Sequence, residues 1–179
     1  MVTLYAAIFK DTSFRFPMLA GCLTGGVLFS YISSASSVLM DQYGLGQQQF
    51  AYAFGFNALG IMIVSSINKK LVSKLGTMTR LKIGGGIQLT GAALVLLSGL
   101  ISDAPIAMVM AGLFLAVSGL GMTGPNAMAL AMSRQGARAG TASAIMGSMQ
   151  FGCGLLGGVI LNFLVWNALL NMGIMMMLF

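Results

Sequence analysis

Hydroxyl and amide side chains are the groups best suited to chemistry in the apolar parts of this sequence. Ser30, Ser33, Ser34 and Ser37 recur at three- and four-residue steps, so on a helix they share one face, with Tyr31 at its edge. On a membrane-spanning helix such a face should point at a cavity or at another helix, because lipid offers no hydrogen-bond partner. The pattern fits a binding-cavity wall, or hydroxyls bonded back to their own helix at a packed interface.

Four amide side chains also lie inside apolar runs: Asn57, Gln88, Asn126 and Gln150. Each is costly in hydrocarbon and therefore needs a partner. Asn126 follows Pro125, which lacks an N–H and so frees a carbonyl one turn earlier. We expect a kinked helix here, with Asn126 in a cavity and Gln150 facing it. The candidate cavity residues are Ser30, Tyr31, Ser34, Asn57, Asn126 and Gln150.

The composition excludes most catalytic chemistry. The chain contains no His, and its three acidic residues, Asp11, Asp41 and Asp103, fall outside the apolar runs. Hydrolysis and metal binding therefore lack a base and a ligand set, and we predict no enzyme activity, metal or cofactor. Cys22 and Cys153 lie within apolar runs, far apart in sequence, and are expected to be small packing residues rather than a disulfide.

The elements that hold these residues are predicted to be transmembrane helices. Of 179 residues, 58% are hydrophobic and only 7% charged, against about 25% charged in a soluble domain. This composition indicates an all-α integral membrane protein, with residues 1–15 forming a juxtamembrane segment before the helices of 16–179. Six spans are predicted, at residues 16–40, 50–67, 81–101, 106–132, 141–161 and 164–179.

The last predicted span is short. Its sixteen residues would rise about 24 Å, less than the roughly 30 Å of the hydrocarbon core. We therefore expect a truncated helix, or a natural chain that continues, with Met175 to Met177 facing lipid. Two small-residue repeats predict close helix contacts, Gly21 with Gly25 and Gly154 with Gly158.

The basic residues predict the orientation. Residues 68–82 contain five of the nine basic residues and no acid. With six spans, all nine fall in the N-terminal segment, in residues 68–82 or in residues 133–140, which share one side of the membrane. Asp41 and Asp103 fall on the other side. By the positive-inside rule both termini are cytoplasmic. The net charge of +6 then reflects topology rather than a nucleic-acid partner.

Several short stretches resemble one transporter family: Tyr43–Leu45, Gln49–Gly55 with Asn57, Thr123–Ala127 and Ala139–Ala144. Together they resemble the C-terminal half of a major facilitator superfamily transporter, most closely the Bcr/CflA-type drug:proton antiporters. The resemblance implies helices seven to twelve of twelve, arranged as a 3+3 inverted repeat. It also implies substrate binding between two six-helix halves that alternate access. Asn57 and Gln150 are then expected near the interface between halves, and Gln88 in an interhelical hydrogen bond.

A degenerate copy of the family's cytoplasmic loop motif falls on Ser73-Lys74-Leu75-Gly76, with Arg80 downstream. Lys74, Gly76 and Arg80 fit that motif. Ser73 stands where the family has a carboxylate, so a charge-pair role for this loop does not carry over.

The resemblance implies one half of a proton-coupled multidrug efflux pump of the bacterial inner membrane. The implied partners are the lipid bilayer, a small drug-like substrate, and either an N-terminal six-helix half or a second copy of this chain. No Asp or Glu lies in a predicted span, so the proton-coupling acid would belong to the other half. We expect the chain to be inactive alone. The alternative is a non-transporting fragment or structural membrane module.

Overall fold

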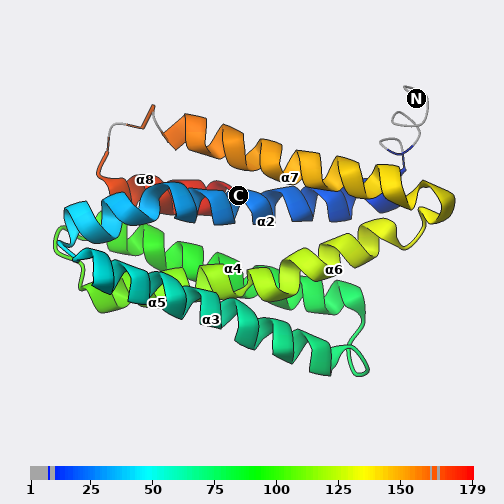
Figure 1. The fold of residues 1–179 in the computed structure, drawn as a ribbon, viewed down its shortest axis with the longest axis horizontal. Coiled ribbons are helices and arrows are strands. Elements are labelled where there is room, and N and C mark those ends of the chain that lie inside the picture. Colours follow the sequence, from blue (N-terminus) through cyan, green and yellow to red (C-terminus); the bar gives the residue numbers. More distant parts are fainter. Residues whose placement is uncertain (1–7, 9–10, 162, 165) are drawn as a thin grey trace.

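The computed structural model is a bundle of antiparallel helices (Figure 1). It describes residues 8, 11–161, 163–164 and 166–179, apart from the side chain of residue 137. The described helices are α2 (Thr12–Ser36) with a π-helical extension η1 (Ser37–Gln42), α3 (Gln47–Leu71), α4 (Thr77–Leu100), α5 (Ile106–Ser118), α6 (Leu120–Met132), the 3₁₀ turn η2 (Gly136–Arg138), α7 (Ala139–Leu161) and α8 (Ala168–Leu178).

Five helical stretches among the described residues are long and apolar enough to cross a membrane: Thr12–Gln42, Gln47–Leu71, Thr77–Leu100, Ile106–Met132 and Ala139–Leu161. They correspond to the first five predicted spans. Four of these five helical stretches are longer than the predicted spans, because each helix continues into the polar residues that flank its apolar run. The sixth prediction was wrong at its start, since α8 begins at Ala168 rather than at residue 164 and has only 11 residues.

Local capping determines where the helices begin. Asp11 is the N-cap of α2, and its carboxylate accepts hydrogen bonds from the Ser13 N–H at 2.9 Å and hydroxyl at 2.7 Å. Residues 12–15, expected to precede the first helix, are therefore helical. These bonds lower the pKa of Asp11, helped by Gln135 and Arg134. The Asn167 side chain caps α8 by accepting the Leu170 N–H at 2.7 Å.

The fourth span, Ile106–Met132, contains a single turn residue, Gly119, whose backbone dihedral angles stay helical (φ −56°, ψ −26°). Gly119 separates α5 from α6, and a side chain there would collide with Gln88 and with the Gly84 carbonyl of α4. Pro125 lies inside α6, which continues to Met132. Close contact with α4 requires a glycine at position 119, and the kink expected at Pro125 stays a prediction.

The helices form a bundle with α3 and α7 on opposite flanks (Figure 1). Helix α2 packs against α6 and α7, α4 packs against α5, α6 and α8, and α3 packs against α5 and α6. In the most apolar 18-residue segment of each helix, only 22% is buried for α3 and for α7. The buried share is 56% for α2 and for the α5–α6 span. The flanking helices therefore offer the largest outer surfaces.

Small residues let α2 and α7 approach closely, as predicted. A side chain at Gly21 would collide with Met146, one at Gly25 with Gln150, and one at Gly154 with Phe29. The prediction for the methionines was largely wrong. Met175 and Met176 are almost fully buried and only Met177 is exposed, because α8 packs against α4 and α2.

Connections alternate between the two ends of the bundle. The N-terminal end of α2, the α3–α4 connection and the α6–α7 connection lie at one end, and the other connections lie at the opposite end (Figure 1). The described basic residues belong to the first end; Lys10 lies outside the described residues. A hydrogen bond from Gln135 Nε2 to Asp11 Oδ2 at 3.1 Å joins two of these segments. At the opposite end the Tyr43 hydroxyl donates to the Ala104 carbonyl at 2.9 Å.

Candidate functional site

Two candidate cavity residues bond to each other inside the bundle. Asn57 Nδ2 of α3 donates to the Tyr31 hydroxyl of α2 at 3.0 Å. The Tyr31 ring stacks on Phe54 with centroids 5.0 Å apart. Asn57 is fully buried, and its Oδ1 has no partner among the described residues. Its expected place near an interface between halves was wrong, since it lies within the six-helix unit.

The serine face of α2 divides into two parts. Ser30 is completely buried and its Oγ has no partner in the described structure. Ser33, Ser34 and Ser37 instead line a pocket of about 1030 Å³ between α2, α7 and the start of α8. These three serines therefore face a pocket, and the interpretation of this face as a substrate-cavity wall stays a prediction. Ser30 belongs to the packed interior.

Aromatic rings, glycines and one amide complete this pocket. Phe29 of α2 and Phe151 of α7 form an edge-to-face pair with centroids 5.6 Å apart. Gly152 contributes bare backbone from α7. At the α8 side, Asn171 Nδ2 donates to the carbonyls of Leu164 at 3.2 Å and Trp166 at 3.1 Å. No charged residue lines the pocket among the described part of the chain.

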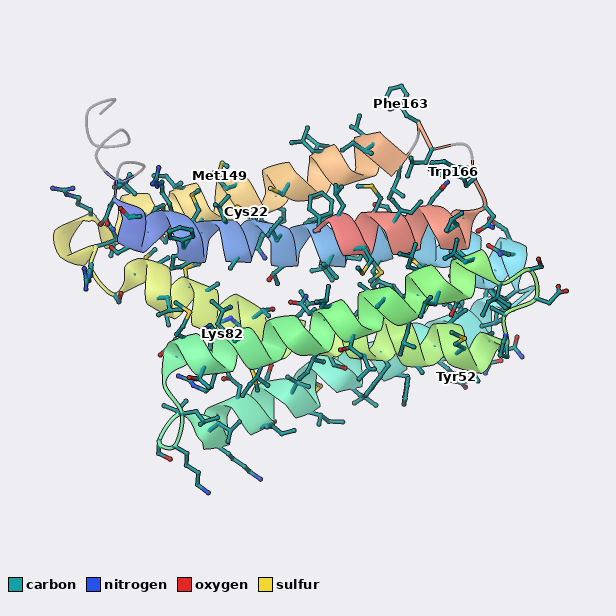
Figure 2. All side chains as sticks on the ribbon, turned by 180° about the vertical axis from the view of Figure 1, so that it is seen from behind. Cys22, Tyr52, Lys82, Met149, Phe163 and Trp166 are labelled. Carbon is teal, nitrogen blue, oxygen red and sulfur yellow. The ribbon has the colours of Figure 1, made fainter. Side chains whose placement is uncertain are left out.

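The connection between α7 and α8 lies at the end of the bundle that is opposite the basic connections. Figure 2 shows Phe163 and Trp166 on this connection, at the opposite end from Lys82 in the first turns of α4. Both aromatic side chains are mainly exposed. Exposed aromatic residues at this position suit the membrane–water interface.

Asn126 is not in the pocket and does not bond to Gln150. Its Nδ2 donates to Asn68 Oδ1 of α3 at 2.9 Å and to the Met122 carbonyl at 2.6 Å. Asn68 Oδ1 also accepts from Arg80 Nη1 of α4 at 2.9 Å. Gln150 is half-buried and lies against Gly25 of α2. The structure therefore replaces the predicted Asn126–Gln150 pairing by a junction of three helices.

Arg80 is the charged member of this junction and is 7% exposed. Its Nε donates to the Leu75 carbonyl at 3.1 Å and its Nη2 to Thr77 Oγ1 at 3.2 Å. These acceptors and Asn68 are neutral, so the described residues give Arg80 no carboxylate partner. Lys74 is exposed and Gly76 is the N-cap residue of α4. Of the motif residues, Gly76 is thus the first residue before α4, and Arg80 is hydrogen-bonded to Asn68 of α3.

The carbonyl freed by Pro125 supports the same junction. Pro125 cannot donate to Gly121, four residues earlier, and Ser65 Oγ of α3 donates to that carbonyl at 3.3 Å. A side chain at Gly121 would collide with the Ile61 carbonyl. The sequence-based expectation of a freed carbonyl was useful, although its partner is a serine of another helix and not a ligand.

Sequence reasoning missed Asn68 and Ser65. A signal for Asn68 was present, because it follows Asn57 by eleven residues, close to three turns of helix, and so lies on the same buried face of α3. The adjacent Lys69 and Lys70 hid this signal, because neighbouring lysines are typical of a loop and Asn68 was therefore predicted to lie in one. In the structure α3 extends to Leu71 and buries it.

Two other predictions concern buried polar and thiol groups. Gln88 is buried beside Gly119, and its Nε2 has no partner among the described residues, so the structure does not provide the expected interhelical bond for that group. Cys22 of α2 and Cys153 of α7 belong to one apolar cluster as free thiols, despite their separation in sequence. Their role as packing residues at the α2–α7 contact agrees with the expectation.

The bundle of apolar helices, five of them long enough to cross a membrane among the described residues, points to a multi-pass α-helical membrane protein. A family model of the Major Facilitator Superfamily matches residues 1–178, and the chain belongs to this superfamily. It is therefore a member of a transporter family and not an enzyme. It is 32% identical over 143 residues to the Bicyclomycin resistance protein homolog of Haemophilus influenzae, covering 79% of this chain and 35% of that protein.

A second relative is the Uncharacterized MFS-type transporter YdgK of Bacillus subtilis. It is 32% identical over 155 residues, which cover 86% of this chain and 37% of the relative. The chain thus spans about a third of the length of the curated relatives that it matches.

Proposed function

We propose that this chain forms the C-terminal six-helix half of a proton-coupled multidrug efflux transporter of the bacterial inner membrane. The observation that carries the proposal is the uncharged pocket on the serine face of α2, in a chain similar to a bicyclomycin resistance protein homolog. Small drug-like substrates would be exposed alternately to the two sides of the membrane by rocking of two halves.

The helix pairings support a 3+3 inverted repeat. Helix α2 packs on α7, as the α5–α6 segment packs on α3, and α4 packs on that segment, as α8 packs on α2. The first three spans are α2, α3 and α4, and the last three are α5–α6, α7 and α8. When the first three are superimposed in order on the last three, each contact named here falls on the contact it is compared with. Such a repeat is the half-unit of many transporters, and a second half is then needed to enclose a substrate between them.

The charge distribution supports a cytoplasmic location for the end that carries Arg15, the α3–α4 connection and the α6–α7 connection. On this orientation the pocket of Ser33, Ser34 and Ser37 lies in the outer half of the membrane. Both termini of the six-span unit would then be cytoplasmic.

Proton coupling is assigned to the partner half. Asp11, Asp41 and Asp103 are the only acids of the chain, and none lies in the apolar interior. A second copy of this chain would not supply a membrane-embedded acid. An N-terminal six-helix half with such an acid is therefore the favoured partner.

The test is drug efflux in a pump-deleted bacterium that expresses this chain alone or together with a matching N-terminal half. Resistance only on co-expression, lost with a proton uncoupler, is the expected result. Resistance from the chain alone would contradict the assignment of coupling to the other half. No resistance in either strain, with both proteins present in the membrane, would favour a non-transporting fragment or structural module.

Substitutions separate contact with the drug from packing. Ser33→Leu, at the exposed part of the pocket wall, is expected to lower resistance without lowering the amount of protein. Tyr31→Ala, Asn57→Ala and Asn126→Ala remove buried hydrogen bonds and are expected to lower the amount of folded protein. If Asn126→Ala lowers resistance while the amount of protein is unchanged, Asn126 contacts the substrate and the packing role is contradicted.

A further inference from the structure

The α3–α4 connection concentrates positive charge at one corner of the bundle (Figure 1). Residues 68–82 contain five of the nine basic residues of the chain and no acid. Four of the five have exposed side chains and form the lysine cluster: Lys69, Lys70, Lys74 and Lys82. Figure 2 shows Lys82 at this end, in the first turns of α4. The charge of the cluster therefore faces the surroundings of the protein rather than its interior.

The fifth basic residue, Arg80, is buried and holds the connection in one shape. Its Nε donates to the Leu75 carbonyl at 3.1 Å and its Nη2 to Thr77 Oγ1 at 3.2 Å. Its Nη1 donates to Asn68 Oδ1 at 2.9 Å, which ties the end of α3 to the start of α4. The lysines are thus presented from a backbone that is already fixed, so a partner does not have to order the connection when it binds.

The charge of the lysine cluster is not compensated by a nearby acid. Asp11 is the acid at the basic end of the bundle, and it belongs to the α6–α7 connection. Its Oδ2 accepts from Gln135 Nε2 at 3.1 Å, and the charge of Arg134 acts on it. Asp41 and Asp103 lie at the opposite end, in η1 and after α4. The cluster is therefore free to attract an anionic partner from outside the chain.

Apolar side chains are exposed between these lysines. Val72, between Lys70 and Lys74 in sequence, is 57% exposed, and Met78, in the first turns of α4, is 47% exposed. Such side chains among cations are unfavourable in water, but they suit the boundary between lipid headgroups and acyl chains. A nucleic acid or an acidic soluble protein offers phosphate or carboxylate groups without that apolar phase. The surface therefore fits a membrane with negative headgroups best.

We propose that the lysine cluster binds the phosphate groups of anionic phospholipids, with Val72 and Met78 at the level of the first acyl carbons. Four or more basic residues next to a membrane-spanning helix are sufficient for such recognition, and each contributes about fivefold in affinity. The proposal requires that this end of the bundle meets the membrane surface. It does not require transport, so it stands or falls separately from the efflux experiment.

The test is native mass spectrometry of the purified full chain in detergent with equal amounts of phosphatidylglycerol and phosphatidylcholine. The two lipids carry slightly different acyl chains, so that their adducts differ in mass, and the measurement is repeated with the chains exchanged. The expected result is at least tenfold more adduct with phosphatidylglycerol, the anionic lipid. Equal amounts of the two adducts would overturn the proposal.

Two double variants remove the same charge from two different connections. Lys70→Gln with Lys74→Gln should lose most of the preference for phosphatidylglycerol, at about fivefold for each lysine. Arg134→Gln with Arg138→Gln should change the preference less than about twofold, because Asp11 already offsets part of that charge. Equal losses in the two variants, with helix content unchanged by circular dichroism, would show a response to net charge alone and would overturn the proposal.

A charge-conserving variant separates attraction from misfolding. Lys70→Arg with Lys74→Arg keeps both cations and should prefer phosphatidylglycerol as the wild type does. Loss of the preference in this variant, at unchanged helix content, would contradict a role of the positive charge and overturn the proposal.

Ionic strength and free phosphate separate an exposed lipid surface from a site for a small anion. Raising ammonium acetate from about 50 mM to about 500 mM should reduce the preference severalfold, because salt screens exposed charges. A preference unaffected by salt would contradict binding by exposed lysines. Inorganic phosphate at constant ionic strength should not displace the lipid, since it offers nothing to Val72 and Met78. Full displacement would show a free-anion site and overturn the lipid assignment.

Discussion

Asn126 Nδ2 donates to Asn68 Oδ1 at 2.9 Å, across 58 residues of sequence, and this bond joins α6 to α3. The same oxygen accepts from Arg80 of α4. One amide oxygen therefore connects three helices at the basic end of the bundle. Because Asn68 serves two donors and Asn126 is one of them, the two residues should differ in their importance for stability.

Asn68→Leu is expected to destabilise the protein more than Asn126→Leu. The first change leaves the Arg80 guanidinium and the Asn126 amide both short of an acceptor, at a cost of about 3 kcal/mol. The second leaves the Arg80–Asn68 bond in place and should cost about 1 kcal/mol. Unfolding in mixed micelles with increasing SDS measures both. Equal losses would show that the shared oxygen is not the centre of the junction.

Gly121→Ala is expected to be strongly destabilising, by about 3 kcal/mol, because its Cβ would meet the backbone of Ile61 and Ser65, which cannot rotate away. Gly86→Ala, inside helix α4 and not next to a proline, is the control. Nothing lies within 4 Å of its Cβ, and alanine favours a helix over glycine. Thermal unfolding in detergent should show a large drop for the first variant and no drop for the second. Similar behaviour of the two would contradict the close α3–α6 approach.

Tyr31→Phe should destabilise the fold by about 1 to 2 kcal/mol, because Asn57 would lose its only described hydrogen bond. The double variant Tyr31→Phe, Asn57→Leu should recover part of this loss, since it removes both polar groups together. SDS-induced unfolding of the two single variants and the double variant measures the coupling. Strict additivity of the two single effects would contradict a direct bond between these side chains.

Ionisation of Tyr43 is expected to lower the stability of the fold at alkaline pH. Burial raises the pKa of the Tyr43 hydroxyl, and the nearby Asp103 carboxylate raises it further. A raised folded-state pKa stabilises the fold below the unfolded-state value of about 10, and this contribution is lost as the pH rises through the folded-state pKa. Tyr43→Phe should cost about 1 kcal/mol near neutral pH, through the lost bond to the Ala104 carbonyl, and less at higher pH.

The measurement is the difference in unfolding temperature between wild type and Tyr43→Phe from pH 7 to above pH 10, which cancels the titration of the lysines. A difference that narrows with rising pH is expected. A constant difference would mean that ionisation of Tyr43 does not contribute, and a widening one would reverse the sign of its pKa shift.

The sequence by itself determined which segments lie in the membrane and which end of the bundle is basic. Both follow from properties that act residue by residue. Apolar runs of sufficient length are helical in lipid, since each backbone group must be satisfied within its own segment, and Lys and Arg remain outside the hydrocarbon. The span from residue 106 to 132 was therefore predicted at both ends, and the close packing at Gly21 and Gly25 followed from spacing alone.

The tertiary structure decided which partner each buried polar group has. That Asn57 bonds to Tyr31, that Asn126 bonds to Asn68 rather than facing Gln150, and that Gly119 lies against α4 all depend on a neighbouring helix. A hydrogen bond forms only if the rotation and the axial position of both helices bring the donor and the acceptor to within about an ångström of the ideal distance. The local sequence indicates that a buried polar side chain needs a hydrogen-bond partner. Which residue becomes that partner is determined by the packing of helices that are distant in sequence.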